Sequence, residues 1–370
     1  MIEFVAFMTK SQELLLELLR ISTGAKTTLL RAYTDKDWEG AYKLAEEQTI
    51  TGVLLNALEI IREESPDLMP SQVILLQWIG IGQIIETKTK QLAEFGKSVV
   101  DYFHNKGFAC QILKGCAVGR YYPQPLRRSS GDIDIWLYGG RKKIYDFARA
   151  YDKDRKLYGV NYHHIHFHLL EDVHIELHIW PSFLSSPIRN WRLHKFCKLH
   201  SPTMEASITS PAFDRVFILL HCFRHFCGSG VGFRQVMDYY YVLRQGFTEE
   251  ERNDAVYWIR KLGMTCFAGG LMWVLKQSFG LETKYLLMEP IEKEGRFILN
   301  EILLTGNMGH SDKRLWGSKE TALLRFFYNL KRNFYMMGHY PHEAIWQPFF
   351  SIWLYFWRLS KGLLKDREDD

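Results

Sequence analysis

Two aspartates, two residues apart in an otherwise apolar run, are the residues of this sequence with the clearest chemistry. The run covers residues 131–137 and reads Gly-Asp-Ile-Asp-Ile-Trp-Leu. In a β-strand alternate side chains point to the same face, so Asp132 and Asp134 would share one face and the isoleucines the other. Two carboxylates this close repel unless something positive lies between them, usually a divalent cation such as Mg²⁺. Because Asp-x-Asp is also common in polar-faced edge strands, the pair needs further support.

A glycine break between a short strand and a helix lies upstream of the aspartates. Residues 110–122 read Cys-Gln-Ile-Leu-Lys-Gly-Cys-Ala-Val-Gly-Arg-Tyr-Tyr, which predicts a strand that breaks at Gly115. Small residues at such a break let backbone N–H groups approach a ligand, and a helix N-terminus favours anions. Lys114 adds a positive charge beside the turn, and Arg127 and Arg128 stand just before the aspartates. The turn matches neither the P-loop nor the dinucleotide-binding fingerprint.

A histidine-rich segment, residues 162–180, predicts a β-hairpin with one buried face, because polar and apolar side chains alternate on both sides of Glu171-Asp172. A three-residue loop, 170–172, pairs apolar with apolar and polar with polar side chains. Its pairs are Leu169–Val173, Phe167–Ile175, Ile165–Leu177, His168–His174, His166–Glu176 and His164–His178. A two-residue loop would mix the two faces, so the longer loop is favoured. Glu176 then lies on a polar face, as a third carboxylate for the metal ions of the aspartate pair.

Together these features resemble the polymerase-beta-like nucleotidyltransferase superfamily, and within it a bacterial branch of uncharacterised nucleotidyltransferase-family proteins. The resemblance extends from about Trp38 to His310. Besides the aspartate run, the segments that carry it are Leu113-Lys114-Gly115, Tyr121-Tyr122-Pro123, Arg127 or Arg128, Glu176-Leu177-His178, Leu220-His221 with His225, Gly232 to Asp238, and Gly306 to His310.

The resemblance implies a set of site residues. Asp132, Asp134 and Glu176 would be the catalytic carboxylates and would bind two Mg²⁺ or Mn²⁺ ions, with the aspartates bridging both. The turn at Gly115 would hold a nucleoside triphosphate. The residues expected around that nucleotide are Lys114, Gly115, Cys116, Arg127, Arg128, Ser130, Arg234 and Asp238. Cys116 departs from the family pattern, which has serine or glycine there, so phosphate binding would depend more on the backbone and on the lysine before the turn.

The expected reaction is transfer of a nucleoside monophosphate from a nucleoside triphosphate to a hydroxyl. In a two-metal site one ion activates the attacking hydroxyl and the other holds the triphosphate and the leaving pyrophosphate. Positioning and charge neutralisation do most of the work in phosphoryl transfer, so few other groups are needed. The acceptor stays open among a sugar or lipid-linked glycan, a small molecule, a protein side chain and an RNA end.

Two other functions remain as alternatives. One is a catalytically inactive nucleotide- or partner-binding protein of the same fold, against which the three converging acids count. The other is a His/Glu metallo-hydrolase, because six of the fourteen histidines lie between His163 and His178 and imidazole with carboxylate suits Zn²⁺, Fe or Mn. The absence of any standard zinc spacing argues against this second alternative.

Two pairs of residues at helical spacing have both a structural and a functional interpretation. His221 and His225 lie one turn apart on the same helix face and are expected to line the core or the active site rather than to bind a metal. Arg234 and Asp238 are four residues apart, which favours an ordinary ion pair. The functional interpretation of this second pair is a polar face at the mouth of the cleft, with Arg234 contacting phosphate or the acceptor.

The predicted fold class is α+β, a small mixed β-sheet core with a β-hairpin embedded in a largely helical protein. The predicted regions are a helical one at 1–105, the catalytic core at 106–200 and a second helical one at 201–370. Apolar residues at three-to-four spacing predict helices over Glu13–Ile21, Asp37–Glu64, Ile74–His104 and Arg141–Tyr151, with Asp37 as an N-cap and Pro70-Ser71 between two helices. Residues 181–187 are expected to form a loop and 202–211 a linker, with helices from Pro211 onwards.

Composition agrees with a packed enzyme in a reducing cytoplasm. The chain has 370 residues, of which 47% are hydrophobic, enough for a large core. Its net charge of +5 is dispersed, which is compatible with phosphate-containing substrates but is no strong sign of nucleic-acid binding. Six cysteines without CxxC pairing, and no signal peptide at the start, make the cytoplasm the expected compartment.

The C-terminal segment 344–364 is dense in aromatic and aliphatic residues. Gln347, Pro348 and Ser351 interrupt it, so it falls short of a transmembrane span. A buried helix is therefore expected. The alternative is an interfacial helix that holds the enzyme at the inner face of a membrane, because the segment is aromatic and ends in basic residues.

Overall fold

The computed structural model describes residues 8–152, 156–169, 173–309 and 322–363. They form a largely helical protein with one four-stranded mixed sheet, which confirms the predicted α+β class. The helices are α2 (Lys10–Ser22), α3 (Asp35–Glu47), α4 (Thr51–Glu64), α5 (Gln72–Asn105), α6 (Cys116–Gly119), α7 (Gly140–Tyr151), α8 (Pro187–Leu199), α9 (Pro211–Cys227), α10 (Phe233–Arg244), α11 (Glu249–Leu262), α12 (Thr265–Phe279), α13 (Glu292–Thr305), α14 (Ala322–Met336) and α15 (Pro341–Ser360). Short 3-10 turns cover Pro66–Leu68, Pro125–Arg127, Thr283–Tyr285 and Asn307–Gly309.

The sheet is built from β1 (Cys110–Ile112), β2 (Ile133–Leu137), β3 (His164–Phe167) and β4 (Ile175–His178), in the spatial order β1-β2-β4-β3. β2 and β4 are parallel, whereas the two outer strands pair antiparallel. β3 and β4 form the predicted hairpin in the predicted register, with His166 opposite Glu176 and Ile165 opposite Leu177. The loop residues 170–172 lie outside the described residues. The observed pairs therefore confirm the predicted register. This pairing keeps the polar and the apolar side chains on separate faces.

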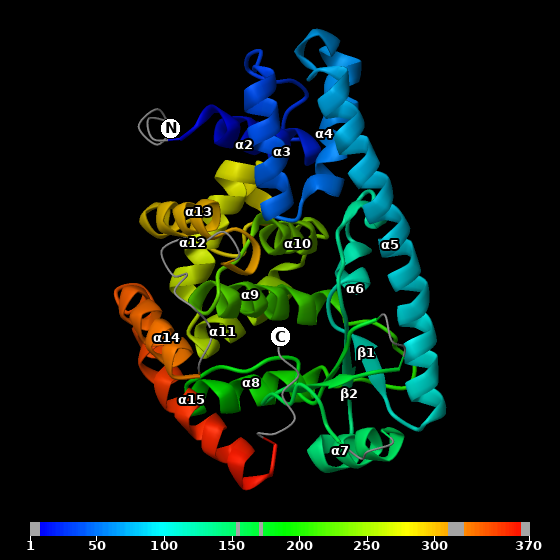
Figure 1. Ribbon diagram of the computed structural model, residues 1–370. Helices are drawn as coiled ribbons and strands as arrows, with labels where there is room; N and C mark the ends of the chain where they lie inside the picture. Colours follow the sequence, from blue (N-terminus) through cyan, green and yellow to red (C-terminus); the bar gives the residue numbers. More distant parts are fainter. Residues whose placement is uncertain (1–7, 153–155, 170–172, 310–321, 364–370) are drawn as a thin grey trace.

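The two faces of the sheet have opposite character. Alternating residues of each strand form an apolar face that packs against α5 and α7, through side chains such as Phe103 and Ile144. The polar face carries the aspartate and histidine side chains and turns toward the helical body, where Trp136 stacks on Phe213 of α9 at 5.5 Å. Figure 1 shows α5 along one side of the molecule, with β1 and β2 between it and α9. Candidate site residues therefore lie between the sheet and the helices.

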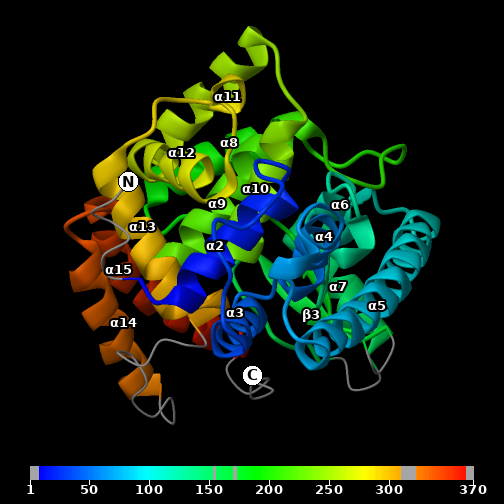
Figure 2. The same cartoon turned by 90° about the horizontal axis from the view of Figure 1, so that it is seen from above.

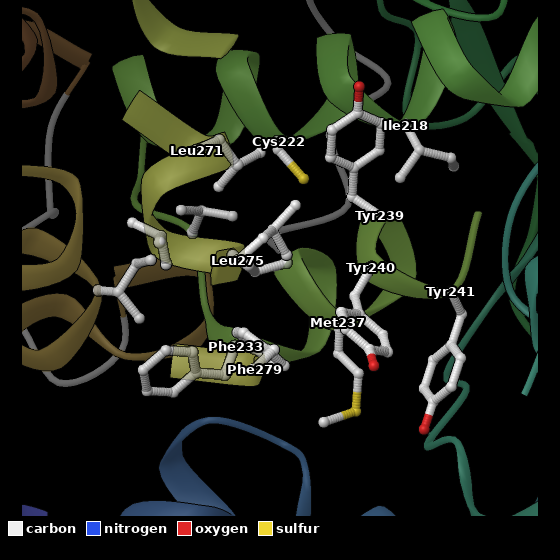
Figure 3. Close-up of a cluster of buried hydrophobic side chains, with 14 of the residues drawn as sticks. Ile218, Cys222, Phe233, Met237, Tyr239, Tyr240, Tyr241, Leu271, Leu275 and Phe279 are labelled. Carbon is white, nitrogen blue, oxygen red and sulfur yellow. The ribbon is translucent and has the colours of Figure 1, made fainter. Parts of the chain in front are cut away.

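The N-terminal and C-terminal helices share one hydrophobic core. Residues of α2, α3 and α4 belong to the same buried cluster as residues of α9, α10 and α12. Figure 2 shows these helices grouped beside one another, and Figure 3 shows a part of the core where Ile218, Met237 and Leu275 converge from α9, α10 and α12. Gln48 anchors this packing, because its amide donates to the Ile302 carbonyl and accepts from the Phe233 N–H. The predicted boundaries at 105 and 200 stay a prediction.

Most predicted helix positions agree with the structure, but the N-cap of α3 is one turn earlier than expected. Thr34 is the cap, and Asp37 occupies the third helical position. The Thr34 hydroxyl accepts from the Asp37 N–H, and the Asp37 carboxylate accepts from the Thr34 N–H. This reciprocal capping box satisfies two backbone donors, where a cap at Asp37 would satisfy fewer. Asp37 therefore contributes as the partner of the cap.

The expectation of a buried C-terminal helix is wrong. α15 packs along α14 and against the β3 side of the sheet, where Phe350 and Trp353 contact Tyr162. Many of its apolar side chains remain exposed, with Phe349 and Phe356 each 60% exposed. Nothing in the described part of the chain covers these side chains, because the helix lies at the outside of the molecule (Figure 1). Among the described residues, no helix combines the length and hydropathy needed to cross a membrane.

Candidate active site

Asp134 and Glu176 lie directly opposite each other on the parallel strands β2 and β4. The Asp134 side chain is 1% exposed, and its Oδ1 atom accepts from two cations of the chain itself. Lys114 Nζ lies 2.9 Å from Oδ1, and His178 Nε2 lies 2.9 Å from the same atom. His178 Nε2 is also 3.1 Å from Glu176 Oε2, so one imidazole connects both carboxylates. Lys114 and His178 therefore supply positive charge beside Asp134 and Glu176, whereas the sequence argument concerned the pair Asp132 and Asp134.

The pKa values of Asp134, Glu176 and His178 follow from those contacts. Burial alone would raise the pKa of Asp134, but Lys114 and the His178 hydrogen bond outweigh it and lower that pKa. Burial likewise opposes ionisation of Glu176, but the nearby His164 and the hydrogen bond from His178 lower its pKa overall. For His178, burial favours the neutral ring, yet its bonds to the two carboxylates raise its pKa to about 9. The carboxylates are thus ionised at neutral pH with their own counter-charges in place.

Asp132 directly precedes β2, two residues before Asp134, and is not neutralised in the same way. Its pKa is raised, first by repulsion from Asp134 and then by burial, and Lys114 only partly opposes this. Within the described residues no hydrogen bond reaches Asp134 Oδ2, although this atom is buried. The poorly compensated Asp132, beside a buried and unpaired oxygen of Asp134, fits a divalent cation that takes oxygen ligands. Among the described residues, ligand atoms of Asp134, Glu176 and His178 lie within 4.8 Å of one another, and the role of Asp132 as a further ligand stays a prediction.

Gly115 forms the predicted break between β1 and α6. Its φ of +60° lies in the left-handed region that favours glycine. A Cβ built on Gly115 would lie 3.5 Å from the Asp132 carbonyl oxygen and 3.9 Å from Ser130 Oγ, so the turn is beside the aspartate run. Burial raises the pKa of the Cys116 thiol, which keeps that small side chain neutral. The structure therefore brings Lys114, Gly115, Cys116 and Ser130 next to the aspartates.

A family model described as an uncharacterised nucleotidyltransferase matches residues 34–280, two-thirds of the chain. The chain belongs to this family. The match contains all the residues predicted for the site, whereas the Gly306–His310 motif lies beyond it. Comparison with the curated proteins and with the solved structures gives no match. Membership of the nucleotidyltransferase family supports nucleotidyl transfer as the type of function.

In this member of the family, Arg128 and Asp238 form a buried bidentate ion pair between the loop before β2 and α10. Both guanidinium–carboxylate bonds measure 2.7 Å, and the Tyr122 hydroxyl donates to Asp238 at 2.6 Å. Arg128 also donates to Ser130 Oγ at 2.8 Å, which fixes the segment between the Gly115 turn and the aspartates. The structural interpretation of an Arg234–Asp238 ion pair is wrong, because Asp238 instead accepts two hydrogen bonds from the guanidinium of Arg128.

Arg234 instead points its guanidinium toward the aspartate run. It donates to the Ser129 carbonyl at 3.2 Å, and within the described residues its buried Nε atom has no acceptor. Burial lowers the pKa of Arg234, followed by repulsion from Arg128, while Asp238 and Asp132 act in the opposite direction. A buried cation with a spare donor is suited to receive an anionic oxygen. This geometry favours the functional interpretation of Arg234.

Arg127 is directed away from the site. Its guanidinium pairs with Glu59 of α4 at 2.6 Å and with Glu86 of α5 at 2.9 Å. These two contacts join the loop to the N-terminal helices and leave the site to Arg128 and Arg234. Of the two adjacent arginines, only Arg128 borders the aspartate run.

His221 and His225 of α9 line the helical side of the site, as expected. Their rings are 4.4 Å apart, and burial lowers both pKa values, that of His225 to about 3, with Lys114 adding to the effect. Both imidazoles are therefore neutral at pH 7. Within the described residues neither belongs to a group of side chains close enough to hold a metal ion.

Sequence reasoning missed the central contact of His178 with both acids. The signal was present, because His178 lies two residues after Glu176 on the same strand face. It also missed the Tyr122–Asp238 hydrogen bond. No local pattern marks that bond, since the two residues come from distant elements that only the fold brings together.

Proposed function

We propose that this protein is an active, metal-dependent nucleotidyltransferase that transfers a nucleoside monophosphate from a nucleoside triphosphate to a hydroxyl acceptor. The observation that carries the proposal is the position of Asp134 directly opposite Glu176, with a buried oxygen of Asp134 unpaired and Asp132 uncompensated beside it. Bound Mg²⁺ or Mn²⁺ would lower the pKa of the attacking hydroxyl and hold the triphosphate. Asp132, Asp134 and Glu176 are assigned as the residues that hold these cations.

The nucleotide is assigned to the space beside the Gly115 turn. Lys114 is paired with Asp134. When a metal ion binds Asp134, the ammonium group of Lys114 would be free to bind a triphosphate oxygen instead. Arg234 supplies a further donor, and Ser130 and Cys116 are the small side chains along the path. Arg128 and Asp238 are positioning residues in this proposal, because their groups are engaged with each other.

The acceptor is assigned to a cavity of about 170 Å³ between α9, α14 and α15. Its wall contains Arg224, whose guanidinium lies 3.4 Å from the Phe183 ring centre. Amide and hydroxyl side chains, Asn333 and Ser351 among them, supply further polar contacts. Phe183 in turn contacts His163, whose ring is 5.3 Å from His178. These features suit a hydroxylated, negatively charged molecule of about one ring in size.

Cytoplasmic residence with peripheral contact to an anionic membrane is part of the same proposal. The exposed face of α15 carries Phe349 and Phe356, Arg358 lies in its last turn, and Lys361 follows the helix. Aromatic and basic side chains together favour the membrane interface. Sedimentation with anionic vesicles should be lost in Phe349→Ser/Phe356→Ser, and equal sedimentation of the two proteins would contradict the contact.

The competing function is a non-catalytic binding protein of the same fold. It is favoured by one observation, that Lys114 and His178 already neutralise Asp134. Calorimetric titration of each nucleoside triphosphate, with and without Mg²⁺ or Mn²⁺, separates the transferase from a partner-binding protein that takes no nucleotide. We expect metal-dependent binding by the wild type and by Asp101→Asn, which changes an exposed acid of α5, and none by Asp132→Asn. If no triphosphate binds with any metal, the transferase proposal fails.

A further inference from the structure

The hairpin presents a second set of metal-ligand side chains on the polar face of the sheet, made of imidazoles rather than carboxylates. One ligand atom each from His164, His166 and Glu176 lies within 4.8 Å of the others. His166 is directly opposite Glu176 on the neighbouring strand, and His164 is two residues earlier on the same face. The antiparallel pairing that the sequence pattern predicts thus brings two imidazoles to one carboxylate.

The separations within this set fit ligands of one ion better than a hydrogen-bond network. His164 Nδ1 is 3.1 Å from Glu176 Oε2, yet it is buried and makes no hydrogen bond of acceptable geometry within the described residues. His166 Nε2 is 3.9 Å from Glu176 Oε1, beyond hydrogen-bond reach. Two donors that each lie about 2.1 Å from the same ion are about 3–4 Å from each other.

The donor types differ from those of the aspartate pair. Mg²⁺ takes oxygen ligands, whereas imidazole suits Zn²⁺, Mn²⁺ and Fe²⁺. Two histidines and one carboxylate on one side of an ion leave open positions for water or a substrate oxygen. His178 is hydrogen-bonded to Glu176 at 3.1 Å and so helps to fix the orientation of the Glu176 carboxylate.

We propose that His164, His166 and Glu176 form a binding site for a divalent transition-metal ion, and that Glu176 is shared between this site and the oxygen-ligand site of Asp132 and Asp134. Binding of the ion does not depend on the proposed transferase function. Its consequence for catalysis rests on that function: the cation on the Glu176 side would be Mn²⁺ or Zn²⁺ rather than Mg²⁺.

The test uses the full chain after removal of metals with a chelator. Mn²⁺ is added at one equivalent, and pulsed electron paramagnetic resonance detects nitrogen nuclei bound to the ion. We expect nitrogen coupling in the wild type, and at least a tenfold weaker affinity for Zn²⁺ in His166→Gln, measured by competition with a coloured chelator. An Mn²⁺ spectrum with oxygen ligands alone overturns the proposal, and this result requires no variant to fold.

Two matched variants make the outcome specific. His174→Ala removes an exposed histidine whose ring is 6.4 Å from that of His166 and which belongs to no ligand group among the described residues. It should keep the nitrogen coupling and the wild-type affinity; an equal loss in His174→Ala and His166→Gln would overturn the site. Asp132→Asn should lose triphosphate binding and keep the coupling, so failure of the transferase function and failure of this site are distinguishable.

Discussion

Asp134 and Glu176 face each other across two parallel strands and accept hydrogen bonds from the same imidazole nitrogen of His178. The arrangement explains how two acids stay ionised in a buried place. His178 and Lys114 balance them, while Asp132 beside them has no comparable partner. The unfavourable charge is therefore concentrated at Asp132. Such a residue is expected where ligand binding is maintained at a cost in the stability of the folded protein.

Asp132→Asn should stabilise the metal-free protein and abolish metal-dependent triphosphate binding. The substitution removes a charge whose pKa is raised chiefly by Asp134, so the repulsion disappears. We expect a gain of about 0.5–2 kcal/mol in the free energy of unfolding, measured in urea. Asp101→Asn serves as the control and should change neither quantity. A destabilised Asp132→Asn protein would show that the carboxylate has a structural partner instead.

Lys114→Met should destabilise the metal-free protein by about 3–5 kcal/mol, because it leaves a buried carboxylate with one counter-charge fewer. Addition of Mg²⁺ or Mn²⁺ should restore more stability to this variant than to the wild type, since the cation takes the place of the ammonium group. Thermal unfolding with and without metal measures both effects. If metal stabilises neither protein, the site does not bind these ions.

Substitutions of Arg128 and of the adjacent Arg127 should differ sharply in their effect on the free energy of unfolding. Arg128→Met breaks a buried bidentate pair and leaves Asp238 uncompensated, at a cost of about 3–5 kcal/mol. Arg127→Met loses partly exposed pairs with Glu59 and Glu86, worth about 1 kcal/mol or less each. Triphosphate binding should persist in Arg127→Met. Loss of binding there, with the fold intact, would return Arg127 to the nucleotide site.

His194 should make the protein less stable in mild acid. Its ring stacks on Trp180 at 3.8 Å, and burial, followed by Lys198 and Arg141, lowers its pKa to about 4. The folded state therefore binds its proton less readily than the unfolded state. Its contribution is complete above pH 6.5 and is lost as the pH falls from 6.5 to 4.

We expect about 1–2 kcal/mol from His194 after allowing for its partial exposure. His194→Phe keeps an aromatic ring at the stack but cannot be protonated. The free energy of unfolding of this variant should depend less on pH between 6.5 and 4 than that of the wild type. Identical pH profiles would exclude His194 as a source of acid sensitivity.

Arg224→Met should preserve or raise stability and remove binding of a small anion. Burial lowers the pKa of Arg224 to about 10, with Glu343 acting against it, so the buried guanidinium is held at a cost. Inorganic phosphate should raise the melting temperature of the wild type and of Arg62→Met, an exposed arginine on α4, but not of Arg224→Met. An equal rise in the melting temperature of all three proteins would contradict the assignment of the cavity as the acceptor site.

Period-two alternation determined the hairpin, its register and the common face of the acids, because side-chain direction in a strand is a local property. The glycine turn beside Asp132 and the family resemblance were likewise readable from short motifs. Neighbours that are close in sequence were less reliable guides. Thr34, and not Asp37, is the N-cap of α3. Asp238 pairs with Arg128, and not with its helical neighbour Arg234.

Tertiary structure alone decided the partners of the buried charges. The parallel pairing of β2 with β4 set Asp134 opposite Glu176, and no local pattern specifies which strands become neighbours. Asp238 pairs with Arg128 rather than with Arg234, although both are arginines, because the fold brings the guanidinium of Arg128 to the carboxylate in a two-pronged contact. The exposed face of α15 was also undecided by sequence, since an apolar helix face is the same whether or not the fold covers it.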